Sequence, residues 1–418
     1  MRAPTGKLLW LRLVRAAVLS AAVCSALPAL AADFRFTPVL SLSEEFNDNM
    51  LNTAHDRQSD FITRLQPGAA ALYRGPSLNG ELSYNFDYQN YARGTREDEK
   101  NHFLALRGSA ELVDNFLFLE ASDTLSRVSL KVTRDVTSES AFANQTDQNR
   151  GSFSPYLLWR LGSKSTLKTG YRFTDTSYWG SPGIDKREHR GFADLSHEPL
   201  ARLQLSAGYA FGRAATDLVD YDQHDLSSGF RYEYAEKSHL YAGIGNSWQS
   251  FSDTRSASNL FWHAGISRDV GFAVGTLETR AQYAEDPLTV STKETSYSAR
   301  LERALQHGAL GISSSYSKYL DTRGGAGVRR KAVVGGFARY EMTPRLNASL
   351  ALTGDKVSRE TVDDYAYRLN GTAGLDYGFN YDISASLNYS YIVYRRDWES
   401  AADAKETNRV VFAVRKAF

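Results

Sequence analysis

Charged side chains recur at alternating positions along much of this sequence, and they are the residues whose types could do chemistry. A guanidinium binds a carboxylate or phosphate through two parallel hydrogen bonds. Carboxylates occupy the same alternating positions and could neutralise the arginines. The candidates are Arg64, Glu81, Asp87, Arg107, Glu111, Arg172, Arg231, Glu233, Glu278, Arg280, Arg300, Glu302, Arg339, Arg368 and Arg409. They predict either paired charges that hydrate an interior surface or unpaired arginines that select an anionic solute or polymer.

Signals for catalysis and for metal binding are weak by comparison. The 8 histidines show no metal-ligand spacing, and His189 and His197 have no evident carboxylate partner. Serine, histidine and aspartate are plentiful, so a triad assembled from several strands stays open as an alternative. No glycine-rich phosphate loop precedes a helix. We therefore predict a protein that is not an enzyme and that uses no metal and no other cofactor.

Alternation also defines the elements that would position these charges. In the segment 78–91 the even positions up to 88 are apolar, aromatic or small, and the odd positions up to 89 are polar. The even positions are Leu78, Gly80, Leu82, Tyr84, Phe86 and Tyr88, and the polar odd ones are Asn79, Glu81, Ser83, Asn85, Asp87 and Gln89. Because successive side chains of a strand point to opposite faces, this strand has one apolar face and one polar face.

The length of such segments distinguishes membrane-spanning strands from soluble ones. A tilted strand of about 10 residues crosses the apolar part of a bilayer, whereas an ordinary strand has about 5 or 6 residues. The chain is rich in aromatic residues, with 24 Tyr, 21 Phe and 6 Trp, yet its mean hydropathy is only −0.42. A polar chain that lies in lipid is expected to be a closed barrel with a wet interior.

Long and short connections alternate along the chain. Short turns such as Gly162-Ser163-Lys164 contrast with longer polar loops such as the one expected from Glu44 to about Ser59. This sorting predicts tight periplasmic turns and longer external loops. Counting the segments predicts an all-β, antiparallel, up-and-down transmembrane β-barrel of about 20 strands, within a range of roughly 18 to 22. Aromatic girdles are expected at Tyr178, Trp179, Trp248, Tyr377, Tyr381 and Tyr394.

Both ends of the chain carry signals typical of exported barrels. A basic start with Arg2 and Lys7, an apolar run over 16–32 and a small-residue exit predict a cleaved signal peptide over residues 1–31. A single barrel domain over 32–418 would follow, without Cys24, the one cysteine. Phe418 ends an alternating strand and resembles the signal read by the barrel-assembly machinery, although Lys416 replaces a usual hydrophobic residue.

The longest connection, 131–150, is a candidate for a loop that folds into the barrel. A barrel of about 16–18 strands already leaves an aqueous channel, so one of about 20 strands should be hollow unless a loop enters it. The charged candidates for a constriction are Arg134, Asp135, Glu139, Asp147 and Arg150. A loop that stays outside the barrel is the alternative.

Short motifs in the first third of the chain carry a family resemblance. They are the segment 41–49, Ser59-Asp60-Phe61, Pro67-Gly68, and the segments 110–113 and 116–119. These motifs resemble the PEP-CTERM-system-associated outer-membrane proteins, which belong with the β-barrel porins found beside exopolysaccharide operons. The resemblance implies an outer-membrane conduit linked to exopolysaccharide export, and it brings no catalytic residues.

Two main hypotheses of function follow. The first is a monomeric channel in the bacterial outer membrane that passes exopolysaccharide or another hydrophilic solute. The alternative is a non-conducting scaffold barrel of an exopolysaccharide export assembly, and an outer-membrane enzyme ranks third. The expected partners are outer-membrane lipid, the barrel-assembly machinery through the strand ending in Phe418, and exopolysaccharide export components. The net charge of +1 gives no reason to expect a nucleic-acid partner.

Overall fold

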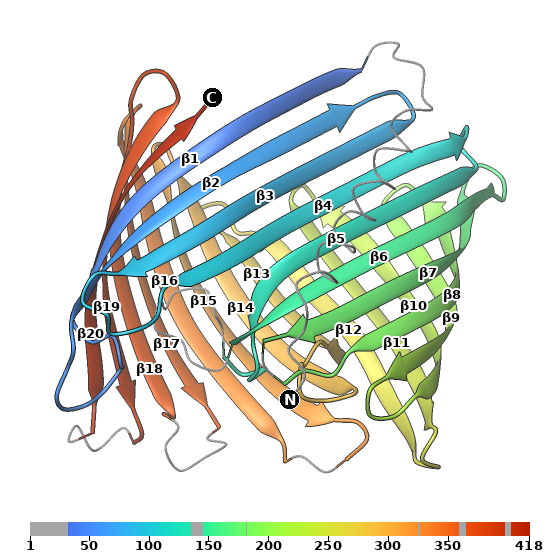
Figure 1. The fold of residues 1–418 in the computed structure, drawn as a ribbon. Coiled ribbons are helices and arrows are strands. Elements are labelled where there is room, and N and C mark those ends of the chain that lie inside the picture. Colours follow the sequence, from blue (N-terminus) through green and yellow to red (C-terminus); the bar gives the residue numbers. More distant parts are fainter. Residues whose placement is uncertain (1–31, 135–144, 181, 325–326, 359–364, 398–402) are drawn as a thin grey trace.

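The computed structural model describes residues 32–134, 145–180, 182–324, 327–358, 365–397 and 403–418, which form twenty strands (Figure 1). No helix in these ranges has the length and apolar character needed to cross a membrane. The strands are β1 (Asp33–Asn47), β2 (Asp60–Arg74), β3 (Leu78–Tyr91), β4 (Glu99–Val113), β5 (Leu117–Ser129), β6 (Gln145–Arg160), β7 (Ser165–Trp179), β8 (Lys186–Leu200), β9 (Leu203–Thr216), β10 (Tyr221–Ala235), β11 (Ser238–Phe251), β12 (Ser256–Asp269), β13 (Val274–Ala284), β14 (Thr292–Leu305), β15 (Gly308–Asp321), β16 (Arg329–Thr343), β17 (Leu346–Val357), β18 (Tyr367–Gly378), β19 (Ile383–Arg395) and β20 (Lys405–Ala417).

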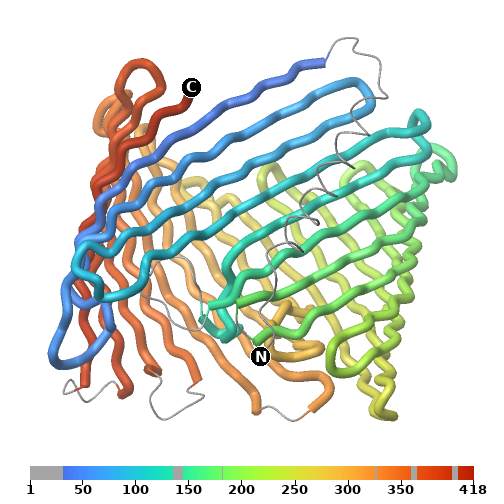
Figure 2. Tube along the Cα trace, in the orientation of Figure 1, coloured from blue at the N-terminus to red at the C-terminus, as the bar shows by residue number. Residues whose placement is uncertain are grey.

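Each strand pairs antiparallel with the next strand in the chain, and the first strand pairs with the last. The seam between β1 and β20 runs from Val39 opposite Ala417 to Asn47 opposite Arg409. Figure 2 traces the chain around this closed sheet. The predicted all-β barrel of about 20 strands is therefore confirmed, and no strand is left as a sheet edge, as a lipid environment requires.

The two faces of the sheet differ in chemistry as the alternation predicts. In β1, Leu40 and Leu42 are 42% and 53% exposed, whereas Glu45 is fully buried. The strand register places outward residues opposite outward residues on each neighbouring strand, so the two faces stay distinct around the whole barrel. The polar face is the interior, because charged residues far apart in the sheet meet on it: Lys186 of β8 lies 3.6 Å from Glu285, which follows β13. The apolar face is therefore the outer wall.

β1 is longer than the sequence pattern indicates. A loop is expected from Glu44 onward, but the strand continues to Asn47. Glu45 and Asn47 lie opposite Val411 and Arg409 of β20. Glu45 binds Arg64 and Arg409 on the interior face, and the pairing with β20 extends the strand through residues that otherwise favour a turn.

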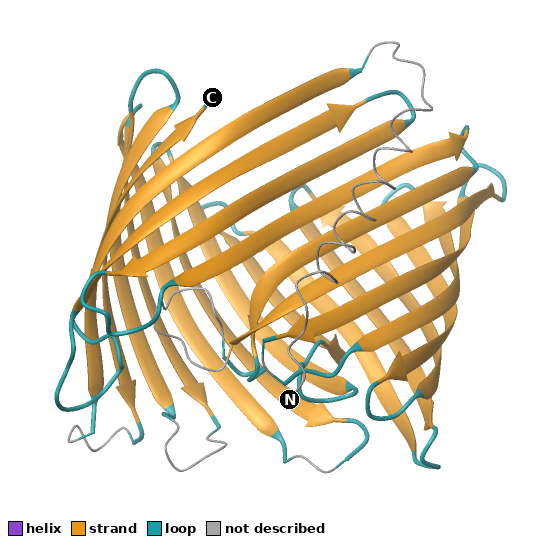
Figure 3. Cartoon of the chain, viewed as in Figure 1, coloured by secondary structure: helices purple, strands orange, loops and turns teal. Residues whose placement is uncertain are grey.

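The connections at the two ends of the barrel differ in length (Figure 3). One end has tight turns, such as Ala201-Arg202 between β8 and β9. Gly162 and Gly271 in these turns adopt φ values of 87° and 88°, which glycine takes without strain. The other end holds the longer loops, including 48–59 between β1 and β2. We call this long-loop end the mouth of the barrel, and its separation from the short turns confirms the predicted sorting.

A charge placed on the outer wall should destabilise the barrel. Leu350 lies in the central part of β17 and is 60% exposed, whereas its neighbour Ser349 faces the interior opposite Arg339. Arginine at the lipid-facing midplane of a barrel costs about 2–4 kcal/mol. We expect Leu350→Arg to lower the free energy of unfolding in lipid vesicles by this amount, and Ser349→Arg to leave it nearly unchanged. Equal losses for the two variants would contradict the assignment of the faces.

Candidate lumen and its constricted mouth

Ion pairs line the interior near the mouth. The carboxylate of Glu45 lies 3.2 Å from Arg64 of β2 and 2.8 Å from Arg409 of β20. In the neighbouring strands β17 and β18, Arg368 Nε donates to Asp355 Oδ1 at 2.6 Å, and both side chains are buried. Among the predicted lumen residues, Arg64, Arg368 and Arg409 thus follow the paired-charge interpretation.

Three further predicted arginines form ion pairs and stay about half-exposed to the lumen. The pairs are Arg300–Glu302 at 2.6 Å, Arg231–Glu233 at 3.7 Å and Arg280–Glu294 at 3.9 Å. The first two join residues two positions apart on the same face of one strand. Exposed ion pairs contribute little to stability, so these groups remain accessible to a solute.

The remaining predicted acids lie on the same interior face. Asp87 accepts a hydrogen bond from Gln89 at 2.6 Å, and Glu278 accepts one from the Tyr241 hydroxyl at 2.7 Å. Glu111 accepts a hydrogen bond from the backbone N–H of Asn115. Glu81 lies opposite Arg107 on the neighbouring strand. In the described ranges, no group of three or more His, Cys, Asp or Glu side chains is placed to hold a metal ion.

Arg107, Arg172 and Arg339 are the interior arginines that fit the alternative interpretation. All three are exposed, and none forms an ion pair with a residue that the structure describes. Arg172 lies opposite Arg190 and 5.6 Å from the Phe192 ring. Arg339 lies 5.3 Å from the ring of Phe337 on its own strand. An exposed guanidinium without an ion-pair partner can bind a carboxylate or phosphate through two parallel hydrogen bonds.

A polar shelf lies on the lumen face of β6 to β12. It has a cavity volume of about 650 Å³ and is lined by polar groups that include Lys168, Asp194, Ser206, Arg231 and Tyr241. We call these residues the lumen shelf. An aromatic platform adjoins the shelf at Lys168: the Lys168 Nζ lies 3.7 Å above the Tyr156 ring, which stacks on Phe118 with centroids 5.2 Å apart.

The connection between β13 and β14 reaches across the interior at the mouth. We call residues 285–291 the inward loop. Glu285 accepts a hydrogen bond from the Tyr178 hydroxyl of β7 at 3.1 Å, and it lies 3.5 Å from Arg150 of β6 and 3.6 Å from Lys186 of β8. The Ile184 N–H donates to Pro287 at 2.8 Å. The loop is thus tied to strands that lie several places away in the sheet.

Buried apolar contacts hold the far end of the inward loop. Val290 is 3% exposed and belongs to a cluster with Ala214, Val219, Tyr221 and Phe251. The neighbouring polar residues are bound too: Asp286 pairs with Arg329, and Gln249 donates to Ser291 at 3.1 Å. The sequence predicts a long connection at Asp286–Thr289 but not that it turns inward, and the signal for the inward turn is Val290, an apolar residue close to the start of β14.

The connection predicted to constrict the barrel, 131–150, differs from the prediction. β6 begins at Gln145, so Asp147 and Arg150 belong to a strand and not to a loop. Asp147 is on the outer face beside Arg127, while Arg150 faces the lumen and Glu285. Asp135 and Glu139 lie outside the described residues. Arg134 does reach inward, with its guanidinium 4.0 Å from the ring of Tyr365, which precedes β18.

Two other loops at the mouth are joined by an ion pair. Arg323 after β15 donates to Asp253 after β11, with Nη2 at 2.7 Å and Nε at 3.2 Å. Hydrogen bonding from Arg323 lowers the pKa of Asp253 below its usual 3.8. Because the pKa is lowered in the folded protein, the contact is complete above pH 3.8 and is lost as the pH falls through the lowered value.

Acid should therefore release these two loops. We expect a spin label on the β11–β12 loop to be immobile at neutral pH and to become mobile only below pH 3.8. In Asp253→Asn the label should already be mobile at neutral pH. A label that loosens at the same acidic pH in both proteins would contradict the role of Asp253.

Comparison with known proteins supports the fold. No family model and no curated protein sequence matches the chain. The FrpB iron transporter from Neisseria meningitidis (F3-3 variant) has a similar structure, with 10% identity, a TM-score of 0.54, and coverage of 92% of this chain and 82% of that one. The siderophore receptor PirA from Pseudomonas aeruginosa is also similar, with 10% identity, a TM-score of 0.51, and coverage of 92% of this chain and 80% of that one. The ferric-catecholate import receptor Fiu from E. coli K12 has 9% identity and a TM-score of 0.53, with coverage of 92% of this chain and 82% of that one. These similarities show the fold alone, a large closed β-barrel.

Proposed function

We propose that this protein is an outer-membrane channel that passes exopolysaccharide or another hydrophilic solute. The observation that carries the proposal is the contrast between the faces of the closed wall. The outer face exposes large apolar side chains, whereas the inner face exposes Arg107, Arg172, Arg339 and the lumen shelf. A barrel built only for anchorage has no need of exposed, unpaired charges inside it.

The chemistry of the lumen favours a sugar polymer that carries anionic groups. Hydroxyl and charged side chains of the lumen shelf can exchange hydrogen bonds with sugar hydroxyls, and the Tyr156–Phe118 platform offers an apolar surface with a polar tip. The unpaired guanidinium groups can bind carboxylate or phosphate substituents. The resemblance to proteins encoded beside exopolysaccharide operons supports the same class of solute. Iron and siderophore transport by the structurally similar receptors is in keeping with a transport function.

A covered mouth favours the second candidate, a non-conducting scaffold barrel of an export assembly. The inward loop spans part of the opening, and Arg134 reaches Tyr365 elsewhere on the rim. Single-channel recording from the purified barrel in planar bilayers separates the two candidates. We expect measurable conductance. A barrel that shows no measurable conductance even after its inward loop is released would favour the scaffold.

The arginines of the lumen should set the ion preference of the channel. One charge at 4 Å is worth about 1 kcal/mol in water, so the triple variant Arg107→Ala, Arg172→Ala, Arg339→Ala should lower the chloride-over-potassium preference by about fivefold or more. The matched control removes three outward arginines, Arg187, Arg213 and Arg303. If both triple variants shift the reversal potential equally, the interior arginines do not form the filter.

A further inference from the structure

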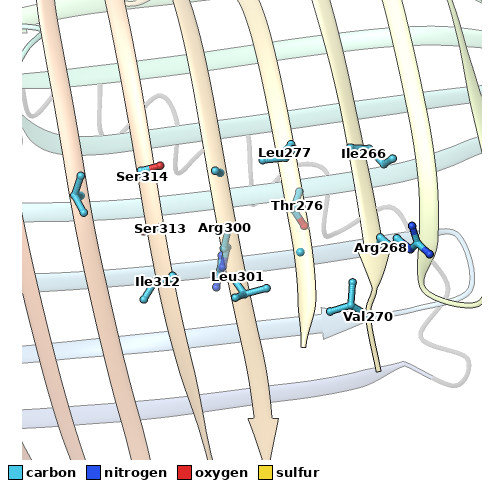
Figure 4. Close-up of a pocket in the computed structure, with 13 residues that line it drawn as sticks. Ile266, Arg268, Val270, Thr276, Leu277, Arg300, Leu301, Ile312, Ser313 and Ser314 are labelled. Atoms are coloured by element: carbon cyan, nitrogen blue, oxygen red, sulfur yellow. The ribbon is translucent and has the colours of Figure 1, made fainter. Parts of the chain in front are cut away.

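An apolar groove lies on the outer wall across β12 to β16, close to the short-turn end. Its cavity volume is about 520 Å³, and its rim is formed by Ile266, Leu277, Leu301, Ile312 and Val334. Figure 4 shows Ile266, Leu277, Leu301 and Ile312 around the groove, with Arg300 on the opposite face of the wall. A volume of about 300–1,000 Å³ is typical of sites that hold a small molecule.

Small residues at outward positions create the groove. Gly275 lies between Arg268 of β12 and Leu301 of β14, and Ala299 of β14 lies opposite Ser314 of β15. A side chain at Gly275 would meet Leu301 only at 3.8 Å, so the space is open and not filled by neighbours. The outer wall therefore has a depression at these small residues, and the outward residues around it are leucine, isoleucine and valine.

Two arginines without acidic partners flank the end of the groove near the short turns. Arg268 lines the groove, and Arg303 follows Leu301 by two residues on the same outward face. Both are exposed, and neither forms an ion pair with a residue of the described ranges. No outward position in the neighbouring rows of β12 to β16 carries an acid. Near the mouth, by contrast, the outward Arg187 and Arg213 pair with Asp175 and Asp222.

We propose that this groove binds one glycerophospholipid of the periplasmic leaflet, with an acyl chain in the groove and the phosphate between Arg268 and Arg303. A phosphate would supply the anionic partner that the two guanidinium groups lack on the protein. The groove extends from Arg268 on β12 across the neighbouring strands to Val334 on β16, so an acyl chain that starts beside the cations would meet apolar side chains along its length. The inference rests on the proposed membrane location but not on transport.

Native mass spectrometry of the purified, delipidated barrel in mild detergent tests the proposal. Phosphatidylglycerol is titrated against diacylglycerol with the same acyl chains and against lipopolysaccharide. We expect one tightly bound phosphatidylglycerol, and weak binding of the other two. Hydrogen bonds to charged groups are worth about 1.5–3 kcal/mol, so Arg268→Ala with Arg303→Ala should weaken binding about tenfold or more. Ala299→Phe should fill the groove and abolish the tight site.

Matched controls distinguish this site from general lipid adhesion. Arg187→Ala with Arg213→Ala removes two outward arginines near the mouth and should leave the affinity unchanged. Retention of the lipid in Ala299→Phe, equal loss in both arginine pairs, or equal binding of diacylglycerol would overturn the proposal. A dimer that Ala299→Phe dissociates would assign the groove to a second copy of the chain instead. Channel conductance should be the same in all these variants, so failure here leaves the proposed function intact.

Discussion

Replacing Glu45 with glutamine is expected to lower the free energy of unfolding by about 3–5 kcal/mol. The Glu45 carboxylate is fully buried and binds two arginines, Arg64 at 3.2 Å and Arg409 at 2.8 Å. These arginines belong to β2 and β20, the two neighbours of β1, so the triad spans the seam that closes the barrel. Glutamine keeps the shape of the side chain but removes the negative charge that both largely buried guanidinium groups contact.

The neighbouring Glu44 provides the matched control for this experiment. Glu44 is on the outer face, is exposed, and accepts a hydrogen bond from Thr63 at 2.7 Å. Glu44→Gln removes the same charge from the same strand and should cost far less. Urea unfolding in lipid vesicles and the heat-dependent mobility shift of the folded barrel on gels measure the difference. A similar loss for both variants would show that the buried triad does not stabilise the seam.

An apolar replacement of the whole triad separates charge pairing from packing. Buried ion pairs are often replaced by well-packed apolar residues without loss of stability. We therefore expect the triple variant Glu45→Met, Arg64→Met, Arg409→Met to recover most of the stability that Glu45→Gln loses. Failure of this variant to recover would indicate that the hydrogen bonds of the triad, rather than the isolated charges, hold the seam.

The outer wall could be predicted from the sequence because one physical cause acts on every strand. Lipid contacts only one face, so Leu82 and Tyr84 alternate with Glu81 and Ser83 wherever a strand crosses the apolar band. The same cause explains the failure at β6. Asp147 and Asn149 are polar residues on the outer face of β6, close to the mouth, where they lie opposite Arg127 and Leu125 of β5. Polar and apolar residues therefore do not alternate at the start of β6, and the sequence pattern there predicts a loop instead of a strand.

Contacts across the lumen could not be predicted from the sequence. They depend on which distant strands face each other after the sheet closes into a barrel. Tyr178 and Tyr394 fit the composition of a lipid-facing girdle, yet both point inward. Tyr178 donates to Glu285 of the inward loop, and Tyr394 is 3% exposed and packs against Tyr365. Each tyrosine lies one position away from an outward residue, so a shift of one residue at a strand end changes the face. The partners that hold them inside come from remote connections.

Releasing the inward loop should open the mouth, and Val290→Asp is the substitution expected to do so. Val290 is 3% exposed within a cluster that includes Tyr221 and Phe251. A carboxylate cannot stay in that cluster, and burial of a valine side chain is worth about 1.5–3 kcal/mol. We expect the equilibrium of the loop to shift about tenfold to a hundredfold toward the detached state.

Conductance and the size limit for neutral sugars measure the result, since a detached loop leaves more of the lumen open. Both should increase in Val290→Asp. Leu288→Asp is the control, because Leu288 lies in the same loop and is 45% exposed, so an added charge there stays in water. The contrary result is a Val290→Asp barrel whose loop is newly accessible to protease while conductance and the sugar size limit are unchanged. The inward loop would then cover the rim without narrowing the path, and the constriction would have to lie deeper, at the level of the lumen shelf.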